Sequence, residues 1–310
     1  CRLSSAQDYT MTASFSLKQR LPLYAEVMRL NRPIGIYLLL WPTLWAVWIA
    51  ANGKPSLKIV VIFSLGVVLM RSAGCVINDW ADRNFDGQVT RTKDRPIASG
   101  RLPAREALYL FVFLIACSAL LLPFLNLKTF YWSFGALALA CLYPFMKRFT
   151  YLPQLVLGAA FSWAIPMAFV AQEQSPNVLC WLLYAANLIW TVAYDTQYAM
   201  ADREDDLKIG VKSTAILFGD FDLALIAMLQ CVFIGLMAMI GYLLHLGMIW
   251  SVTLGICVGL FIWQWRHSRD RIAVHCTEAF LHNHKIGMII FIGLYLTYSL
   301  RYFQQYFIRI

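Results

Sequence analysis

Asn78-Asp79-Trp80-Ala81-Asp82-Arg83-Asn84-Phe85-Asp86 forms an acidic cluster in a chain that is otherwise strongly apolar. A second cluster lies at 195–206, about 120 residues later, and ends in Asp202-Arg203-Glu204-Asp205-Asp206. Charged carboxylates next to hydrocarbon are costly, so each cluster marks a candidate functional site. Carboxylates spaced D-x-x-x-D suit a hard divalent cation, and two such sites suit a diphosphate bound through that cation.

The apolar remainder of the chain predicts an all-α polytopic membrane protein. Hydrophobic residues make up 60% of the 310 residues, and mean hydropathy is +0.61. A helix that crosses a bilayer needs about 20 apolar residues. Nine runs approach that length, which leaves too little chain for a separate soluble domain. They lie at about 34–51, 57–77, 104–125, 128–145, 152–172, 178–198, 221–244, 246–265 and 286–306.

The net charge of +9 is distributed in a way that indicates membrane topology rather than nucleic-acid binding. The alternate connections between spans carry few basic residues, with Lys54, Lys58 and Lys128 as the exceptions. Basic residues concentrate on the cytoplasmic side of membrane proteins. The pattern therefore predicts that the N-terminus and both acidic clusters are cytoplasmic and that the C-terminus lies outside. The basic groups are the N-terminal arm, 83–105, 147–148 with 203–212, and 266–285.

We expect one membrane domain that follows a short arm. The arm is the cytoplasmic segment 1–30, in which 1–10 are expected to be an extension before a start at Met11. The transmembrane domain occupies 31–310, and its order repeats. Two spans, an acidic cluster and two more spans occur twice, and a ninth span closes the chain. This layout predicts a 4+4+1 bundle with a central cavity open to lipid and a site at the interface of the repeats.

Both acidic clusters are expected to continue the preceding helix out of the hydrocarbon. On a helix Asp79, Asp82 and Asp86 are three and four residues apart and point to one side. Like charges so aligned repel, and a cation between them reverses the sign of that energy. The basic stretches that follow, 90–101 and 207–214, are candidates to cap the site and contact phosphate. The second cluster shows the same alignment at spacings of seven and four, with Asp195, Asp202 and Asp206.

A two-metal diphosphate site beside lipid favours a lipid-borne diphosphate, whose tail would lie among the helices. Divalent cations together with Arg or Lys would neutralise a leaving diphosphate and allow an allylic C–O bond to ionise. The carbocation needs a site without water, which a helical bundle supplies. Aromatic residues, at 15% of the chain, can shelter a cation with their π faces.

Three motifs of the chain resemble those of a known family. The motif N-D-x-x-D-x-x-x-D at 78–86, the D-x-x-x-D at 202–206 and Tyr143-Pro144-Phe145-Met146-Lys147 resemble the UbiA superfamily of intramembrane prenyltransferases, over almost the whole chain from about Leu30. Longer strings resemble its bacterial branch that prenylates 4-hydroxybenzoate in ubiquinone synthesis. These strings are Asn31-Arg32-Pro33-Ile34-Gly35, Leu40-Trp41-Pro42-Thr43-Leu44-Trp45, Arg95-Pro96-Ile97, Tyr143 to Arg148 and Ala193 to Met200.

The resemblance implies an enzyme of the bacterial inner membrane that binds Mg²⁺, polyprenyl diphosphate and 4-hydroxybenzoate. It would transfer the polyprenyl chain to the ring carbon ortho to the hydroxyl and release diphosphate, and either an aspartate of the first cluster or the diphosphate would take the ring proton. By the same resemblance, Asp82 and Asp86 would hold one Mg²⁺, and Asp202 and Asp206 the other. The further implied site residues are Arg148 and Lys147 for diphosphate, Arg83 and Arg32 for diphosphate or the benzoate carboxylate, Tyr143 for orienting diphosphate or shielding the cation, Asn78 in the same site, and Asp79 and Asp195 in support.

Two alternatives share parts of this pattern. A prenyltransferase with another acceptor, of the menaquinone or haem type, would keep the metal motifs and differ in its acceptor pocket. A cation-coupled transporter would also have many spans and a repeat, but it would more often bury isolated acids at mid-bilayer. Prenyl chain length, oligomeric state and protein partners leave no signal in the sequence.

Overall fold

The computed structural model describes residues 17–84, 86–89 and 92–307, and this part of the chain is helical without a strand. The predicted extension at 1–10 and the start at Met11 lie outside the described residues, as do positions 90–91 of the first basic stretch. The elements are α1 (Leu17–Val27), α2 (Ile34–Ala50), α3 (Leu57–Asp82), η1 (Asp86–Gln88), α4 (Ala104–Ala119), η2 (Leu122–Phe124), α5 (Leu127–Phe149), α6 (Pro153–Ser162), α7 (Ala164–Ala171), α8 (Val178–Ile209), α9 (Thr214–Phe218), η3 (Gly219–Phe221), α10 (Asp222–Leu243), α11 (Gly247–Ser268) and α12 (Ala273–Phe307).

Eight helical segments of the described chain are long and apolar enough to cross a membrane. This confirms the predicted polytopic, all-α class. The segment predicted at 152–172 is broken at Trp163 into α6 and α7, which together make one candidate span. Helix α2 is apolar but has 17 residues, so it falls short of the other eight. The count of nine and the 4+4+1 arrangement therefore stay predictions.

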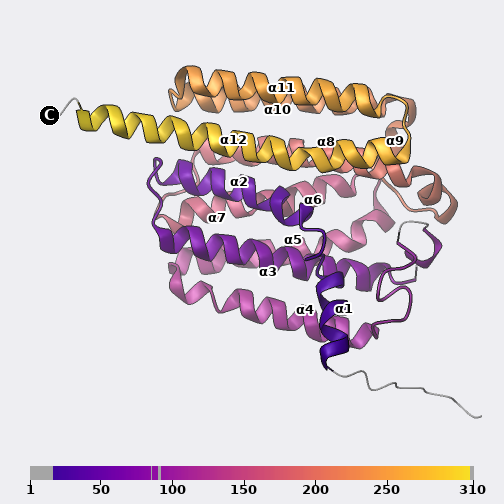
Figure 1. Ribbon diagram of the computed structural model, residues 1–310. Helices are drawn as coiled ribbons and strands as arrows, with labels where there is room; N and C mark the ends of the chain where they lie inside the picture. The colour runs from indigo at the N-terminus through magenta and orange to yellow at the C-terminus, as the bar shows by residue number, and fades with distance from the viewer. Residues whose placement is uncertain (1–16, 85, 90–91, 308–310) are drawn as a thin grey trace, which may run out of the picture.

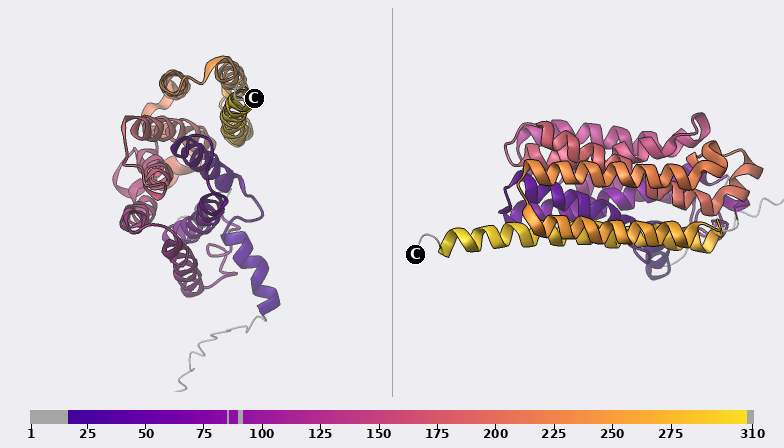
Figure 2. Two further views of the ribbon diagram at one scale, coloured as in Figure 1. Left: turned by 90° about the vertical axis from the view of Figure 1, so that its left-hand side faces the viewer. Right: turned by 90° about the horizontal axis from the view of Figure 1, so that it is seen from above.

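The long helices run side by side and form a curved bundle (Figures 1 and 2). Helix α8 packs against both α6 and α10, and α3 packs against α4. Helix α12 lies against α2, α8 and α11, so the end of the chain closes onto its beginning. The short helix α1 crosses α3 at an angle near one end of the bundle (Figure 1).

An aromatic ladder fixes the centre of the bundle. Trp45 of α2 stacks on Trp190 of α8 with ring centroids 5.5 Å apart, and Trp190 stacks on Phe233 of α10 at the same separation. All three side chains are completely buried, and the Trp45 indole donates a hydrogen bond to the Gly287 carbonyl at 3.0 Å. Stacked aromatic rings bury large apolar areas in a defined geometry. The ladder therefore holds α2, α8 and α10 in one register, with α12 tied to it through Gly287.

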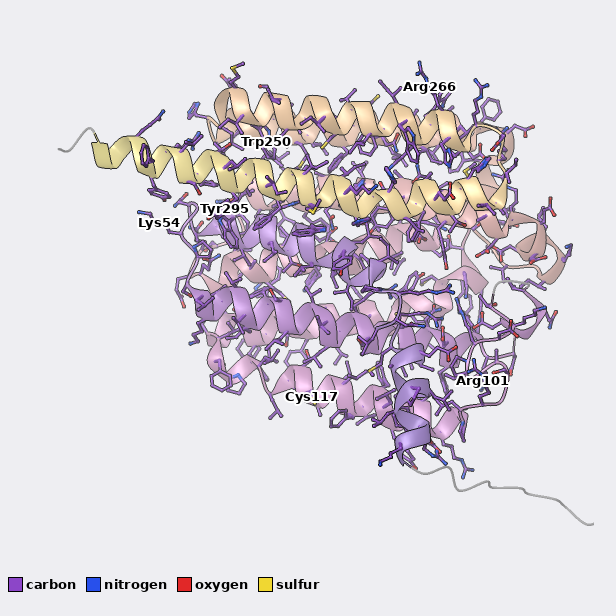
Figure 3. All side chains as sticks on the ribbon, in the orientation of Figure 1. Lys54, Arg101, Cys117, Trp250, Arg266 and Tyr295 are labelled. Atoms are coloured by element: carbon purple, nitrogen blue, oxygen red, sulfur yellow. The ribbon has the colours of Figure 1, made fainter. Side chains whose placement is uncertain are left out.

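Both acidic clusters lie at the same end of the bundle, where α3 ends and where α8 leads into α9 (Figure 1). Figure 3 places Arg101 and Arg266 toward this end and Lys54 at the opposite end. The side chains that α4 and α5 turn outward are large and apolar, with Tyr109 exposed by 73% and Phe113 by 62%. Such an apolar outer surface fits contact with lipid. The chain is thus a multi-pass membrane protein with both acidic clusters at one end of its bundle.

Candidate active site

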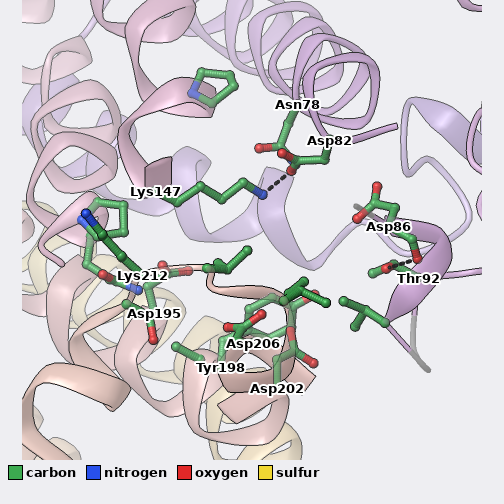
Figure 4. Close-up of a pocket in the computed structure, with 18 of the residues that line it drawn as sticks. Asn78, Asp82, Asp86, Thr92, Lys147, Asp195, Tyr198, Asp202, Asp206 and Lys212 are labelled. Atoms are coloured by element: carbon green, nitrogen blue, oxygen red, sulfur yellow. Dashed lines mark hydrogen bonds and ion pairs between the residues drawn. The ribbon is translucent and has the colours of Figure 1, made fainter. Parts of the chain in front are cut away.

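The carboxylates of the two acidic clusters meet in a cavity of about 150 Å³, the polar cavity. Asp82 and Asp86 line one side, and Asp202 and Asp206 face them from the other (Figure 4). Helix α3 supplies Asp82 and helix α8 supplies the opposite pair, so segments about 120 residues apart in sequence share one site. The other predicted site residues in its wall are Asn78, Tyr143, Lys147 and Asp195.

Asp82 is the last residue of α3 and only 1% of it is exposed. Its Oδ2 atom forms an ion pair with the Lys147 ammonium from α5 (Figure 4). Its Oδ1 atom is buried and has no hydrogen-bond partner. A buried carboxylate oxygen without a partner is unstable unless a cation approaches it. Asp82 thus offers one oxygen to a bound cation while Lys147 holds the other.

Helix α3 ends at Asp82, and Asp86 lies beyond it in the short helix η1. The predicted continuous helix through Asp79, Asp82 and Asp86 is therefore wrong. Arg95 explains the break: its Nη1 atom donates to Asp79 at 3.0 Å and to Asp86 at 2.9 Å. The guanidinium folds the loop back onto α3, and this turns Asp86 into the polar cavity.

Asp79 is 2% exposed and does not line the polar cavity as described. Both of its oxygens accept hydrogen bonds from Arg29, at 2.9 and 3.0 Å, and one also accepts from Arg95. Arg29 follows α1, so Asp79 joins the N-terminal arm to the loop that carries Asp86. Its predicted role in supporting the site stays a prediction.

The second cluster keeps the predicted helical alignment, because α8 continues unbroken to Ile209. The Asn177 side chain caps the start of the helix, and Gly210, with φ of 72°, ends it in the left-handed conformation that favours glycine. The chain then turns back over the cavity, where the Lys212 side chain becomes part of the wall. Residues of the second basic stretch thus line the polar cavity, and their contact with phosphate stays a prediction.

A second cavity of about 300 Å³, the apolar cavity, adjoins this site within the bundle. Its wall is formed by α2 to α7 and consists mainly of aliphatic and aromatic side chains, such as Leu137 and Phe134. Tyr143 of α5 lines both cavities and therefore marks their junction. A polar and an apolar cavity that share a wall residue suit a ligand with a polar head and an apolar tail.

The donor set of the polar cavity fits a divalent cation bound in part by substrate. Within the described residues, no group of three or more His, Cys, Asp or Glu side chains could hold a metal ion by itself. Mg²⁺ typically binds through one or two carboxylates and completes its shell with phosphate oxygens and water. The two pairs of carboxylates and the unpartnered Oδ1 atom of Asp82 match that requirement.

Three predicted basic residues lie elsewhere in the described structure. Arg32 and Arg148 are exposed, and Arg148 donates a hydrogen bond to the Ala81 carbonyl. Arg83 donates to the Trp80 carbonyl at 2.7 Å, and its guanidinium lies 4.5 Å from the centre of the Trp80 ring. None of the three is among the described residues of the polar cavity wall, and their roles stay predictions.

The polar cavity also contains residues that sequence reasoning did not single out. Arg95 was visible as part of a short Arg-Pro-Ile string, but its bridge between two aspartates depends on the folded loop. Gln154 accepts a hydrogen bond from the Thr214 amide at 3.2 Å and so connects α6 with α9. Thr92 and Ser213 also line the wall and belong to the predicted basic stretches 90–101 and 207–214, and Tyr198 belongs to the string Ala193 to Met200, but none of the three was named as a site residue.

Comparison with known proteins supports the family resemblance. The UbiA prenyltransferase family matches residues 39–299. The 4-hydroxybenzoate octaprenyltransferase of Ectopseudomonas mendocina (strain ymp) is 58% identical over 278 residues, covering 90% of this chain and 94% of that protein. The protein of the same name from Azotobacter vinelandii is 59% identical over 277 residues, covering 89% and 94%.

Solved structures share the fold. The apo structure of a UbiA homolog from Aeropyrum pernix K1 superposes with a TM-score of 0.74 at 25% identity, over 84% of this chain and 97% of that one. A UbiA homolog from Archaeoglobus fulgidus, bound to GPP and Mg²⁺, gives a TM-score of 0.69 at 18% identity, over 89% and 99%. The expected superfamily is thereby confirmed, and the chain belongs to the UbiA prenyltransferase family.

Proposed function

We propose that this protein transfers a polyprenyl chain from polyprenyl diphosphate to the ring carbon ortho to the hydroxyl of 4-hydroxybenzoate, with Mg²⁺ as cofactor. The observation that carries the proposal is the junction at Tyr143 between a cavity lined by four facing carboxylates and an apolar cavity. The names of the relatives from Ectopseudomonas mendocina and Azotobacter vinelandii support both the donor class and the acceptor. These relatives favour this acceptor over the menaquinone and haem types, and family membership disfavours the transporter.

The diphosphate would bind in the polar cavity. Asp82 and Asp86 would hold one Mg²⁺, and Asp202 and Asp206 the other. That the Archaeoglobus fulgidus homolog is bound to GPP and Mg²⁺ supports the choice of metal. Bound Mg²⁺ would neutralise the negative charge that develops on the leaving diphosphate. Lys147 lies close enough to join it, because its ammonium already contacts Asp82.

The prenyl tail would extend past Tyr143 into the apolar cavity. The bond between C1 of the prenyl chain and the diphosphate oxygen breaks, and C1 then bonds to the ring carbon of the acceptor. That carbon gives its proton to the departing diphosphate or to an aspartate of the first cluster. The allylic cation formed on the way is protected from water by the apolar wall and faces the Tyr143 ring at the junction. The hydroxyl of the acceptor directs the attack because its oxygen donates electron density to the ortho carbon.

The basic ends of the bundle support the orientation. Arg101 and Arg266 lie toward the same end as the acidic clusters, and by the positive-inside rule this supports a cytoplasmic location for that end and for the N-terminal arm 1–30. We propose that residues 31–310 form one transmembrane domain in a bacterial inner membrane. Helix α1 of the arm packs on that domain through Val27, which is completely buried.

The test uses membranes from cells that express the chain and lack their own prenyltransferase of this class. Radiolabelled 4-hydroxybenzoate, a long polyprenyl diphosphate and Mg²⁺ are supplied, and label in the lipid extract is measured with and without EDTA. We expect label to enter the lipid only with free Mg²⁺. Asp82→Asn and Asp202→Asn should abolish transfer, because each removes a predicted metal ligand.

Asp94→Asn provides the matched control, since it removes an exposed carboxylate of a nearby loop that does not line the polar cavity as described. It should keep wild-type transfer. Full activity of Asp82→Asn and Asp202→Asn would refute the two-metal site. Transfer to a naphthoate acceptor in place of 4-hydroxybenzoate would retain the prenyltransferase and replace its acceptor.

A further inference from the structure

Arg29 has a backbone conformation that ordinarily belongs to glycine. Its φ is 59°, in the left-handed region. Two hydrogen bonds close the turn in which it lies, after the end of α1. The Arg29 amide donates to the Glu26 carbonyl, and the Leu30 amide donates to the Ala25 carbonyl, both at 3.0 Å. Many helices end in this pattern, usually with glycine at the left-handed position. An arginine there strains the backbone, which points to a role for its side chain.

The Arg29 side chain begins a row of four alternating charges that ends at a predicted metal ligand. Its Nη2 atom donates to both oxygens of Asp79, at 2.9 and 3.0 Å. Oδ1 of Asp79 also accepts from Nη1 of Arg95 at 3.0 Å. The same Nη1 atom donates to Oδ2 of Asp86 at 2.9 Å. The row therefore leads from the N-terminal arm to the wall of the polar cavity, and its second arginine is shared between two carboxylates.

The four groups of this row compete for one another because most of them lie out of water. The two aspartates are buried, Arg95 is largely buried, and Arg29 is the most exposed of the four. Charges interact more strongly in such surroundings than at a surface, so a change at one member alters the others. Asp79 receives positive charge from both arginines. The more of it Arg29 supplies, the less Asp79 draws from Arg95.

Arg95 and a bound Mg²⁺ need the same carboxylate. Oδ2 of Asp86 accepts the hydrogen bond from Arg95, and Mg²⁺ binds to proteins mainly through carboxylate oxygens. A guanidinium held on that oxygen lowers its affinity for a metal. By pairing with Asp79, Arg29 allows Arg95 to stay on Asp86 as well. Arg29 is not among the described residues of the polar cavity wall, so it acts on the metal ligand from outside the cavity.

We propose that Arg29 is a positioning residue that lowers the metal affinity of Asp86 by keeping Arg95 shared between Asp79 and Asp86. The inference rests on the function proposed above, in which Asp86 holds Mg²⁺. A site of low affinity suits a metal that completes its shell with phosphate oxygens, because it is then filled only together with the diphosphate. Without Arg29, Asp79 draws Arg95 toward itself, and Asp86 becomes more available to the metal.

The test measures metal binding directly, in addition to activity. Purified full-length protein in lipid nanodiscs is titrated with Mn²⁺, which prefers the same oxygen ligands as Mg²⁺. The unreactive donor analogue geranyl thiolodiphosphate is present, and free Mn²⁺ is measured by EPR spectroscopy. Arg29→Gln should bind Mn²⁺ roughly threefold to tenfold more tightly than wild type, which corresponds to part of one charge-assisted hydrogen bond. The Mg²⁺ concentration for half-maximal prenyl transfer should fall by the same factor.

Three variants separate this effect from damage to the arm. Arg29→Gly also removes the guanidinium but relieves the left-handed turn, so it should bind Mn²⁺ as tightly as Arg29→Gln. Arg29→Lys keeps the charge and loses the planar fork, so it should lie between wild type and Arg29→Gln. Glu26→Gln is the matched control, because the Glu26 side chain connects the same arm to Arg101, outside the row. It should bind Mn²⁺ as wild type does, whereas an effect of arm attachment alone would shift it too.

A double variant tests whether Arg29 acts through Asp79. In an Asp79→Asn protein no charge remains at that position to draw Arg95 away from Asp86. Adding Arg29→Gln should then change Mn²⁺ binding by less than about twofold, since the two substitutions act on one pathway. Size-exclusion profiles and helical circular dichroism report on folding. If neither uncharged Arg29 variant folds, Arg29→Lys carries the test.

Unchanged or weaker Mn²⁺ binding in the folded Arg29 variants would overturn the inference, as would a full effect of Arg29→Gln in the Asp79→Asn background. Failure of the proposed function is distinguishable because it appears already in wild type. If wild type transfers no prenyl group but binds Mn²⁺ with the analogue, the binding series still decides the role of Arg29. If wild type binds no Mn²⁺, the metal site fails and the inference fails with it.

Discussion

The buried cluster around Asp79 allows a prediction about both stability and metal binding. Asp79→Asn keeps the shape of the side chain and removes its charge. Arg29 then loses its carboxylate partner, and Arg95 loses one of its two aspartates and keeps the ion pair with Asp86. Because Asp86 is a predicted metal ligand, a guanidinium that no longer divides its charge between two aspartates will hold Asp86 more tightly. The variant should therefore be less stable and should need more Mg²⁺.

The size of the stability loss follows from burial. Asp79 is 2% exposed, whereas the side chains of Arg29 and Arg95 keep 25% and 15% exposure. Removing one partner of a buried ion pair costs about 3–5 kcal/mol, and the partial exposure of the arginines favours the low end, about 3 kcal/mol. At about 2 °C per kcal/mol for a long chain, the thermal midpoint should fall by about 6 °C.

Thermal unfolding in a mild detergent and a Mg²⁺ titration of transfer activity measure the two effects. Asp205→Asn serves as the comparison, because the Asp205 side chain pairs with Lys208, which is 70% exposed, and such surface pairs contribute less than about 1 kcal/mol. Its midpoint should stay close to that of wild type. An Asp79→Asn protein with an unchanged midpoint would refute the structural role, and an unchanged Mg²⁺ requirement would refute the coupling through Arg95 to Asp86.

Two further predictions concern the prenyl tail and the buried carboxylate at the start of α10. Gly66→Leu adds a side chain to the wall of the apolar cavity, where nothing lies within 4 Å of its Cβ position, so transfer of long prenyl chains should fall about tenfold while geranyl transfer persists. Gly259→Leu, on the exposed face of α11, is the control and should leave the transfer of long prenyl chains and of geranyl unchanged. An equal loss of long-chain and geranyl transfer in Gly66→Leu would contradict the prediction. Asp222→Ala removes a completely buried carboxylate that pairs with Arg203 and Arg271, and should lower stability by about 3 kcal/mol in a thermal melt without changing either KM. A stable variant with altered KM values would instead connect Asp222 to substrate.

Helical periodicity correctly predicted how the aspartates of the second acidic cluster are aligned. For the first cluster it predicted which residues line the polar cavity but not the shape of the backbone that carries them. The second cluster follows the periodic rule because α8 is unbroken through Asp202 and Asp206, so spacing alone determines their direction. The first cluster departs from it because Arg95, from a loop nine residues after Asp86, pairs with that carboxylate beyond the end of α3. Tertiary ion pairs of this kind override local spacing, and a sequence without a fold does not specify them.

Arg71 shows a different limit of sequence reasoning. It lies inside the predicted span 57–77, and an ionisable residue in a span is a candidate site by the same rule that marked the aspartates. A single arginine, however, has no second charged residue whose spacing could be compared with the helical repeat. Its distinguishing contacts are with Gly35 and Phe161, which are 36 and 90 residues away in the sequence. Arg83, on the turn that follows the same helix, donates a hydrogen bond to the Trp80 carbonyl three residues earlier and lies over the Trp80 ring. The two arginines look alike in sequence, but Arg83 makes contacts within its own turn, whereas the buried Nε atom of Arg71 has no hydrogen-bond partner among the described residues.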